Sequence, residues 1–157
     1  MKDKDLELEP VDMYVLFAKM FSHITREVEK ACGEEGVRAV REGVRQFGLE
    51  RGRNIAERAK AMGHENDAKS YLPCYDMGRS ELFNSENDIR EDSIEQLFTE
   101  CIFAKQWMED HDEAYGIHYC EMIDPSIAEG YNEHFKCTHD KHFFKDGCCH
   151  FLFEMKK

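Results

Sequence analysis

Apolar residues recur at helical spacing over the first part of the chain. Between Pro10 and Cys32 they lie three or four residues apart, the pattern of a helix with one buried face. These positions are Phe17, Phe21, Ile24, Val28 and Ala31. Gly33 follows at the place where a glycine commonly ends a helix. The pattern therefore predicts a helix over residues 10–32.

The same spacing returns after Gly33 and continues to Met62, which Gly63 follows. Inside this stretch lie three glycines, each of which costs about 1 kcal/mol in a helix interior relative to alanine. They are Gly43, Gly48 and Gly52. We therefore expect one long helix, or two joined near residues 48–52, in which the glycines serve close packing or a break. Residues 64–90 show no clear period and are predicted to be mostly loop.

The second half of the chain begins with the patterns of a strand and of short helices. Residues 94–99 are rich in strand-forming side chains, and residues 102–108 suit a short helix. Asp124 followed by Pro125 is typical of a helix N-cap with proline at the first helical position. This pair predicts a second short helix that runs to about Gly130.

The last residues of the chain alternate between apolar and polar side chains. The alternation covers residues 135–140 and 149–153, and Asp146–Gly147 between them is a strong hairpin signal. Helices come first and antiparallel strands last, so the fold class is predicted to be α+β. We expect an N-terminal helical bundle packed on a small C-terminal antiparallel sheet.

The length of 157 residues suits one domain with a core of its own. We expect a single domain over residues 1–157. Its helical part is expected at about residues 10–90 and its sheet-containing part at about residues 91–157.

Charge and composition exclude several classes of protein. The chain carries 33 Asp and Glu against 21 Lys and Arg, a net charge of −12, which does not suit binding to a phosphate backbone. We expect no nucleic-acid partner. The longest apolar run, residues 14–18, is far shorter than the roughly 20 residues of a membrane span, and residues 1–10 contain no secretory apolar segment. We therefore expect no membrane partner and a cytoplasmic location, where seven cysteines would remain thiols.

Histidine and cysteine gather at the end of the chain. Six of the eight histidines and four of the seven cysteines lie in residues 111–157. Imidazole and thiolate are zinc ligands, but the sequence has no C-x₂-C pair, and no H-x₃₋₅-H spacing comes with a matching pair of thiols in the expected order. We predict no metal and no cofactor. Along a strand, Cys137 and His139 would share one face with Phe135, so a role in the core competes with a role in chemistry.

A thiol, an imidazole and a carboxylate occur together in residues 118–125. They belong to Cys120, His118 and Asp124. A thiol becomes a good nucleophile when a base or a positive neighbour favours its thiolate. The competing interpretations are that Cys120 is a small buried apolar side chain and that Asp124 is only a helix cap.

Three segments carry a resemblance to a known family. Residues 119–132 read YCEMIDPSIAEGYN, residues 145–153 read KDGCCHFLF and residues 99–104 read TECIFA. The chain resembles the L-2-amino-thiazoline-4-carboxylic acid hydrolase family over most of its length. In that family a C-x₃-D segment precedes an Asn, and a G-x-C-x-F hairpin follows. The resemblance matches Cys120, Asp124 and Cys149 to the recurring Cys, Asp and Cys of the family, Cys101 to an earlier Cys and Asn132 to its Asn.

The resemblance implies a hydrolase that opens a carbon–nitrogen bond of a small cyclic amidine, the named substrate being a thiazoline that carries a carboxylate. Such a reaction needs a nucleophile, a proton donor and a counter-charge for the protonated substrate. We assign the catalytic set to Cys120 as nucleophile, Asp124 as counter-charge or acid/base, Cys149 from the family pattern, and His118 or His139 as proton shuttle.

Substrate binding is expected to involve Asn132, Cys101 and Arg41. A substrate carboxylate would suit an arginine, and Arg41 lies between Arg38 and Arg45 on one helical face. Ordinary solvated ion pairs with nearby glutamates are the competing interpretation. The partner is expected to be a small-molecule substrate, and a homo-oligomer is compatible with the sequence. The alternative function is a non-catalytic sensor module that binds a small molecule or a metal.

Overall fold

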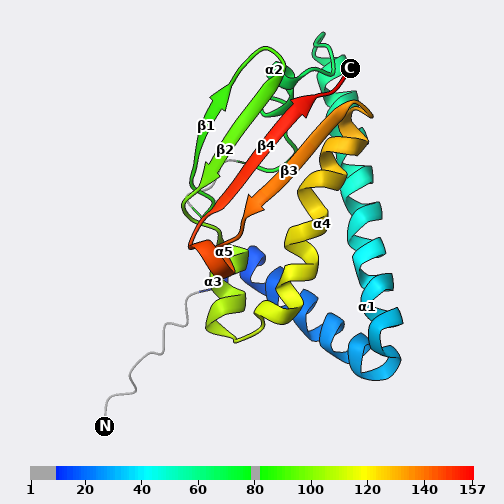
Figure 1. Ribbon diagram of the computed structural model, residues 1–157, viewed down its shortest axis with the longest axis vertical. Helices are drawn as coiled ribbons and strands as arrows, with labels where there is room; N and C mark the ends of the chain where they lie inside the picture. Colours follow the sequence, from blue (N-terminus) through cyan, green and yellow to red (C-terminus); the bar gives the residue numbers. More distant parts are fainter. Residues whose placement is uncertain (1–9, 79–81) are drawn as a thin grey trace.

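The computed structural model describes residues 10–78 and 82–157 and confirms the α+β prediction, with helices packed on one antiparallel sheet (Figure 1). In chain order the elements are α1 (Met13–Ala61), α2 (Ala68–Tyr71), β1 (Ser85–Ile89), β2 (Ser93–Phe98), α3 (Ile102–Glu109), α4 (Glu113–Tyr131), β3 (Phe135–Lys141), α5 (Phe143–Asp146) and β4 (Cys149–Met155).

The long α1 consists of two helical segments that meet at Gly33. The first begins after Asp12, whose carboxylate accepts a hydrogen bond from the Tyr14 N–H at 2.7 Å. Gly33 has φ +61° and ψ −145°, a left-handed conformation that a side chain would strain, and the chain changes direction there (Figure 1). Gly63 follows the second segment with φ +79°. Both predicted helix ends are therefore confirmed.

The second segment of α1 packs closely on α4. A Cβ atom added at Gly52 would lie 2.2 Å from the Ile127 carbonyl oxygen, and one added at Gly48 would lie 2.6 Å from the Ser126 Cβ. Glycines at these places let the two backbones approach. Gly43 has no atom within 4 Å of such a Cβ. The prediction of close packing is therefore confirmed at Gly48 and Gly52, and no break occurs near them.

Residues 64–90 contain more regular structure than the sequence analysis predicted. They include α2 and β1, which pairs with β2 as the edge of the sheet. The burial pattern of β1 shows one half-buried residue followed by four exposed ones, so it lacks the alternation that identifies a half-buried strand. The prediction of mostly loop holds for the other described residues of this segment, but it missed α2 and β1, and main-chain pairing to β2 builds the latter.

The four strands lie in the order β1-β2-β4-β3, and every neighbouring pair is antiparallel. β3 and β4 pair as predicted, but a two-residue turn does not join them. The single helical turn α5 connects them, and Gly147 ends it with φ +69°. The hairpin signal at Asp146–Gly147 thus marked the left-handed glycine correctly and the type of connection wrongly.

The second predicted short helix is part of a longer one. α4 starts at Glu113, so Asp124 and Pro125 lie in its interior. The interpretation of Asp124 as an N-cap was therefore wrong. Proline removes one hydrogen bond from a helix interior, and here the packing of α4 between α1 and the sheet maintains the helix.

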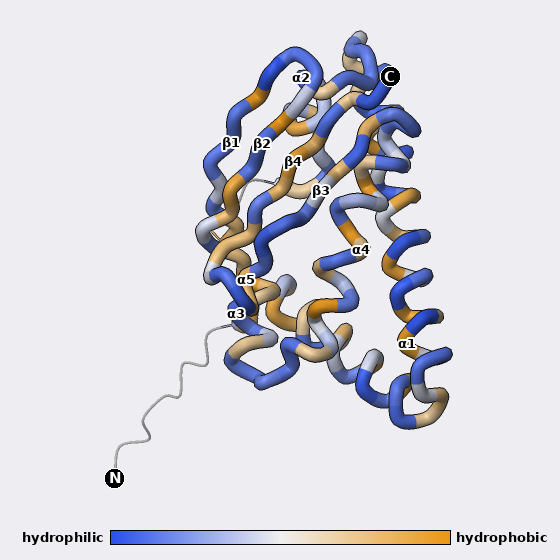
Figure 2. Tube along the Cα trace, viewed as in Figure 1, coloured by the Kyte–Doolittle hydropathy of each residue, from blue (hydrophilic) through white to orange (hydrophobic). Residues whose placement is uncertain are grey.

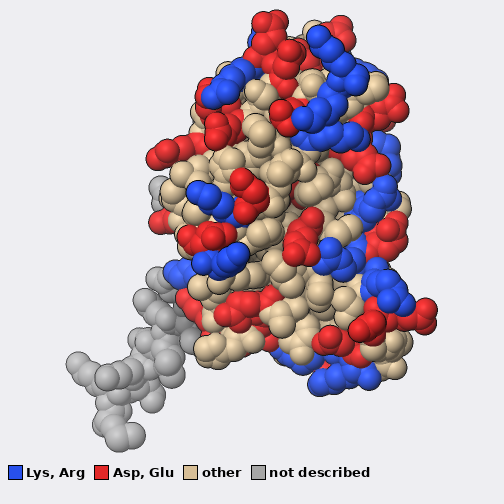
Figure 3. All heavy atoms as spheres, viewed as in Figure 1, with Lys and Arg blue, Asp and Glu red and all other residues tan. Residues whose placement is uncertain are grey.

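One apolar core joins the helices to the inner face of the sheet. Its largest fully buried side chains include Trp107, Tyr71, Phe135 and Phe153. Figure 2 shows hydrophobic and hydrophilic residues alternating along α1, as an amphipathic helix requires. Figure 3 shows acidic and basic side chains interspersed on the face in view. Among the described residues, no helix combines the length and the apolarity needed to cross a membrane.

Candidate active site

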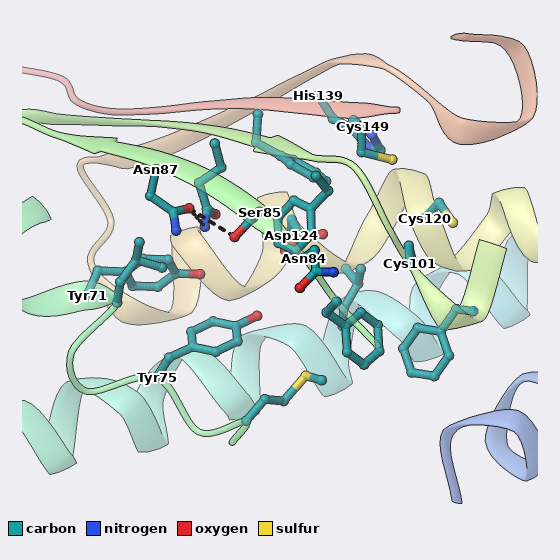
Figure 4. Close-up of a pocket in the computed structure, with 18 of the residues that line it drawn as sticks. Tyr71, Tyr75, Asn84, Ser85, Asn87, Cys101, Cys120, Asp124, His139 and Cys149 are labelled. Carbon is teal, nitrogen blue, oxygen red and sulfur yellow. Dashed lines mark hydrogen bonds between the residues drawn. The ribbon is translucent and has the colours of Figure 1, made fainter. Parts of the chain in front are cut away.

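A cavity of about 670 Å³ is bounded by the inner face of the sheet, α4 and the segment that follows α2 (Figure 4). Aromatic rings form much of its wall, including Phe98, Phe103 and Phe151. Five of the residues predicted from the sequence line it, namely Cys101, Cys120, Asp124, His139 and Cys149. The fold thus brings together side chains from α3, α4, β3 and β4 and from the residue that precedes α3.

Asp124 presents a carboxylate to this cavity from the same face of α4 as Cys120. The two residues are four apart, so their side chains are neighbours along the helix. Burial raises the pKa of Asp124 to about 6, and the positive charge of Arg51 opposes that rise. Among the described residues, no side chain or backbone N–H donates a hydrogen bond to this carboxylate. It is therefore a desolvated acid whose charge has no direct partner.

Arg51 lines the cavity but already has a carboxylate partner. Its Nε and Nη2 donate to the two Asp76 oxygens at 2.9 and 2.7 Å, and its guanidinium lies 5.4 Å from the centre of the Tyr75 ring. Burial lowers the pKa of Arg51, but the hydrogen bonds to Asp76 and the nearby Asp76, Tyr75 and Tyr119 side chains together outweigh burial and raise it. Among the described lining residues, no other Lys or Arg is present to pair with Asp124 or with an anionic ligand.

Three thiols lie at one end of the cavity, from Cys101, Cys120 and Cys149 (Figure 4). Burial is the largest cause of a raised pKa at each, to about 11 for Cys101, to about 12 for Cys149 and well above the ordinary range for Cys120. Backbone N–H groups at the start of α3 lower the pKa of Cys101 in part. All three are therefore neutral thiols near pH 7 and need a proton acceptor before they can attack.

His139 lies beside these thiols with its two ring nitrogens unpaired. Its ring stacks on Phe151 at 4.1 Å between centres and approaches His142 at 3.6 Å. Neither nitrogen makes a hydrogen bond of acceptable geometry with any described residue, although the Cys120 carbonyl faces the ring. Burial, with help from His142, lowers the pKa of His139 to about 4. The ring is therefore neutral near pH 7 and has a nitrogen that can accept a proton.

The other end of the cavity contains polar groups that the sequence analysis missed. Figure 4 shows the hydroxyl groups of Tyr71 and Tyr75 directed into it. Asn87 Oδ1 accepts hydrogen bonds from Gln96 Nε2 at 2.6 Å and from Ser85 Oγ at 3.2 Å. All of these residues except Gln96 lie in the segment predicted to be loop, where no pattern marked them. Arg51 was detectable, because it interrupts the buried face of α1 between Gly48 and Ile55.

Three predicted site residues lie outside this cavity. Arg41 donates to Glu121 at 2.8 Å, and its other contact is with the ring of His118 at 3.2 Å, so both residues belong to an ion-pair network between α1 and α4. Asn132 ends α4, donates to the Asn66 carbonyl at 2.8 Å and accepts from the His134 N–H at 2.9 Å. The assignment of Arg41 and Asn132 to substrate binding, and of His118 to proton transfer, finds no support in this geometry.

The histidines and cysteines near the end of the chain do not all belong to one site. His150 lies on the face of β4 opposite Cys149 and contacts Asp140 at 2.6 Å and Glu95 at 2.9 Å. Among the described residues, no group of three or more His, Cys, Asp or Glu side chains is arranged to hold a metal ion. Alternation along β3 and β4 separates these residues between the two faces of the sheet.

Comparison with known proteins gives one match. No curated protein and no solved structure matches the chain. The model of the family described as L-2-amino-thiazoline-4-carboxylic acid hydrolase matches residues 13–153, nearly the whole chain and all the residues around the cavity. The resemblance found in the three sequence segments is therefore confirmed, and the chain belongs to the L-2-amino-thiazoline-4-carboxylic acid hydrolase family.

Proposed function

We propose that this protein is a hydrolase that opens a carbon–nitrogen bond of a small cyclic amidine bound in the cavity. The observation that carries the proposal is the carboxylate of Asp124, which lines the cavity, is half-buried, lacks a hydrogen-bond partner among the described residues and lies one helical turn from a thiol. A protonated amidine would supply the missing positive charge and several N–H donors. Membership of the hydrolase family supports the reaction class.

In the proposed reaction Asp124 holds the amidinium and Cys120 attacks its central carbon. The Cys120 proton passes to the neutral ring of His139 as the sulfur–carbon bond forms. The ring carbon–nitrogen bond then breaks, and the leaving nitrogen takes that proton. Water hydrolyses the remaining sulfur–carbon bond and restores the thiol. Thiols that are neutral in the free protein suit this order of steps, because the attacking thiolate forms only when a substrate is present.

The carboxylate of the substrate named by the family has no evident partner. Arg51 is occupied by Asp76, Arg41 lies outside the cavity, and no further Lys or Arg lines it among the described residues. We therefore propose the amidine as the recognised group and leave the rest of the substrate open. We also retain the proposals of a single domain, a cytoplasmic location and a metal-free, cofactor-free reaction.

The test is turnover of a panel of cyclic amidines by the wild type and by Cys120→Ser. We expect the variant to lose turnover by at least about 100-fold, because a hydroxyl is far less acidic than a thiol of pKa about 8.5. The exposed Cys32→Ser is the matched control and should retain turnover. A folded Cys120→Ser protein with nearly full turnover would contradict the thiol mechanism and favour water activated by Asp124 or His139.

A second candidate function is a binding module without turnover. The raised pKa of all three cavity thiols favours it, because neutral thiols are poor nucleophiles. This alternative predicts that cyclic amidines bind and are recovered unchanged. The metal-binding form of the alternative finds no ligand group among the described residues. Product analysis after prolonged incubation of a bound amidine separates the two functions.

A further inference from the structure

The ring of Tyr71 is held firmly in the core. It makes edge contacts with Tyr131 at 5.0 Å and Phe135 at 5.1 Å and a tilted contact with Phe153 at 5.4 Å between ring centres. The residue is 1% exposed. Because the ring is enclosed on these sides, the direction of its hydroxyl is fixed, and Figure 4 shows that hydroxyl directed into the cavity.

This hydroxyl has no hydrogen-bond partner among the described residues. Tyr131, one of its ring neighbours, shows the usual arrangement, since its hydroxyl donates to the Asp67 carbonyl at 2.9 Å. A buried hydroxyl without a partner destabilises a fold, so its retention beside a cavity points to a group that binds there. Tyr71 and Tyr131 thus carry the same group, and they differ in whether the hydroxyl already makes a hydrogen bond within the protein.

The side chains around Tyr71 in the cavity determine the chemistry of a ligand that could bind to its hydroxyl. The Asp124 carboxylate can only accept hydrogen bonds when ionised, and the Tyr71 hydroxyl can accept as well. The two strongest donors nearby already have acceptors, because Arg51 donates to Asp76 and the Gln96 amide donates to Asn87. This end of the cavity therefore offers the oxygen of the Tyr71 hydroxyl as a hydrogen-bond acceptor near the negative charge of Asp124.

We infer that Tyr71 and Asp124 form a subsite for the N–H edge of an amidinium or guanidinium ligand, with Tyr71 determining the specificity for that edge. A planar cation of this kind presents parallel N–H donors to two acceptors. A quaternary ammonium ion carries the same charge but no N–H donor. Tyr71 would therefore favour the first ion over the second, whereas Asp124 attracts both.

This inference rests on the proposed function for its choice of ligand, so its test measures binding alone. The probes are 2-aminoimidazoline, a cyclic guanidine that is protonated near pH 7, and tetramethylammonium. Titrations followed by NMR compare the wild-type protein with Tyr71→Phe. The matched control is Tyr131→Phe, which removes a hydroxyl that already has a partner outside the cavity.

We expect Tyr71→Phe to bind 2-aminoimidazoline about 5- to 10-fold more weakly and tetramethylammonium without change. Without ligand, the same variant should unfold about 2–4 °C higher than wild type, because it loses an unpaired hydroxyl and keeps the ring. Tyr131→Phe should show the opposite pair of effects, with unchanged binding and a lower unfolding temperature.

Equal affinity of wild type and Tyr71→Phe for 2-aminoimidazoline would overturn the role of Tyr71. Failure of the wild type to bind either cation would overturn the subsite as a whole. A wild type that prefers 2-aminoimidazoline through Tyr71 but hydrolyses no cyclic amidine would support the subsite and contradict the proposed function. The two failures are therefore distinguishable.

Discussion

Replacing Asp124 by Asn should stabilise the protein at neutral pH while it removes amidine binding. The pKa of Asp124 is about 6 in the fold against an ordinary value of 3.8, a difference of about 2 units. Each unit corresponds to about 1.4 kcal/mol, so the ionised carboxylate destabilises the fold by up to about 3 kcal/mol above pH 6. Asparagine keeps the shape without the charge, and since Asp124 lies inside α4, no helix cap is lost.

The sign of this effect depends on pH. Below pH 4 the carboxyl is protonated in both the folded and the unfolded chain, so the variant gains nothing there. Between pH 4 and pH 6 the unfolded chain releases its proton before the folded one does. The advantage of Asp124→Asn should therefore grow over that interval and remain constant above pH 7, at about 1 to 3 kcal/mol once the buried amide is allowed for.

Urea unfolding of the wild type and Asp124→Asn at several values between pH 4 and pH 8 measures this difference. The control is Asp112→Asn, because burial would raise the pKa of Asp112 but its hydrogen bond with Arg26 lowers it. That variant should lose stability at neutral pH and lose less as the pH falls. A difference between wild type and Asp124→Asn that is the same at pH 4 and pH 8, or that favours the wild type at pH 8, would refute the reasoning.

Two further predictions concern the packing of α1 and the outer face of the sheet. Gly52→Ala should lower the free energy of unfolding by about 1–3 kcal/mol or more, since its Cβ would meet the Ile127 carbonyl. Gly43→Ala has open space around its Cβ and should raise the free energy of unfolding by up to about 1 kcal/mol. Urea unfolding that shows both variants equally stable would contradict this. The imidazole of His150 should titrate above 6.5 in an NMR experiment, because hydrogen bonds to two carboxylates raise its pKa. Its stabilising effect should be present at low pH and be lost as the pH rises through that raised pKa, and a midpoint at or below 6.5 would exclude the contacts in solution.

Local patterns predicted the elements whose stability depends on near neighbours in the chain. The spacing of apolar residues predicted both segments of α1, and Gly33 and Gly63 marked the ends because a left-handed conformation is a property of one residue. Alternation predicted β3 and β4, with Cys137 and His139 on the face of Phe135. The family resemblance identified the thiols and Asp124, which lie together in one cavity.

Other features depend on contacts between distant parts of the chain, which no local pattern contains. β1 exists because β2 pairs with it, and Pro125 lies inside a helix because α4 is held between α1 and the sheet. The ion pair of Arg41 with Glu121, 80 residues away, was not visible in the spacing of either residue, and the assignment of Arg41 to substrate binding stays a prediction that this contact does not support.

The sequence alone determined which residues can do chemistry, since a side chain keeps its donors, acceptors and reactivity wherever it lies. Only the tertiary structure decided which of them are desolvated together. The pKa of Asp124, the neutral state of His139 and the unpaired hydroxyl of Tyr71 all result from burial among residues remote in sequence. Desolvation depends on the residues packed around a group. The pKa values and the unpaired hydroxyl of the site therefore depend on its enclosure by α4, the sheet and the segment after α2.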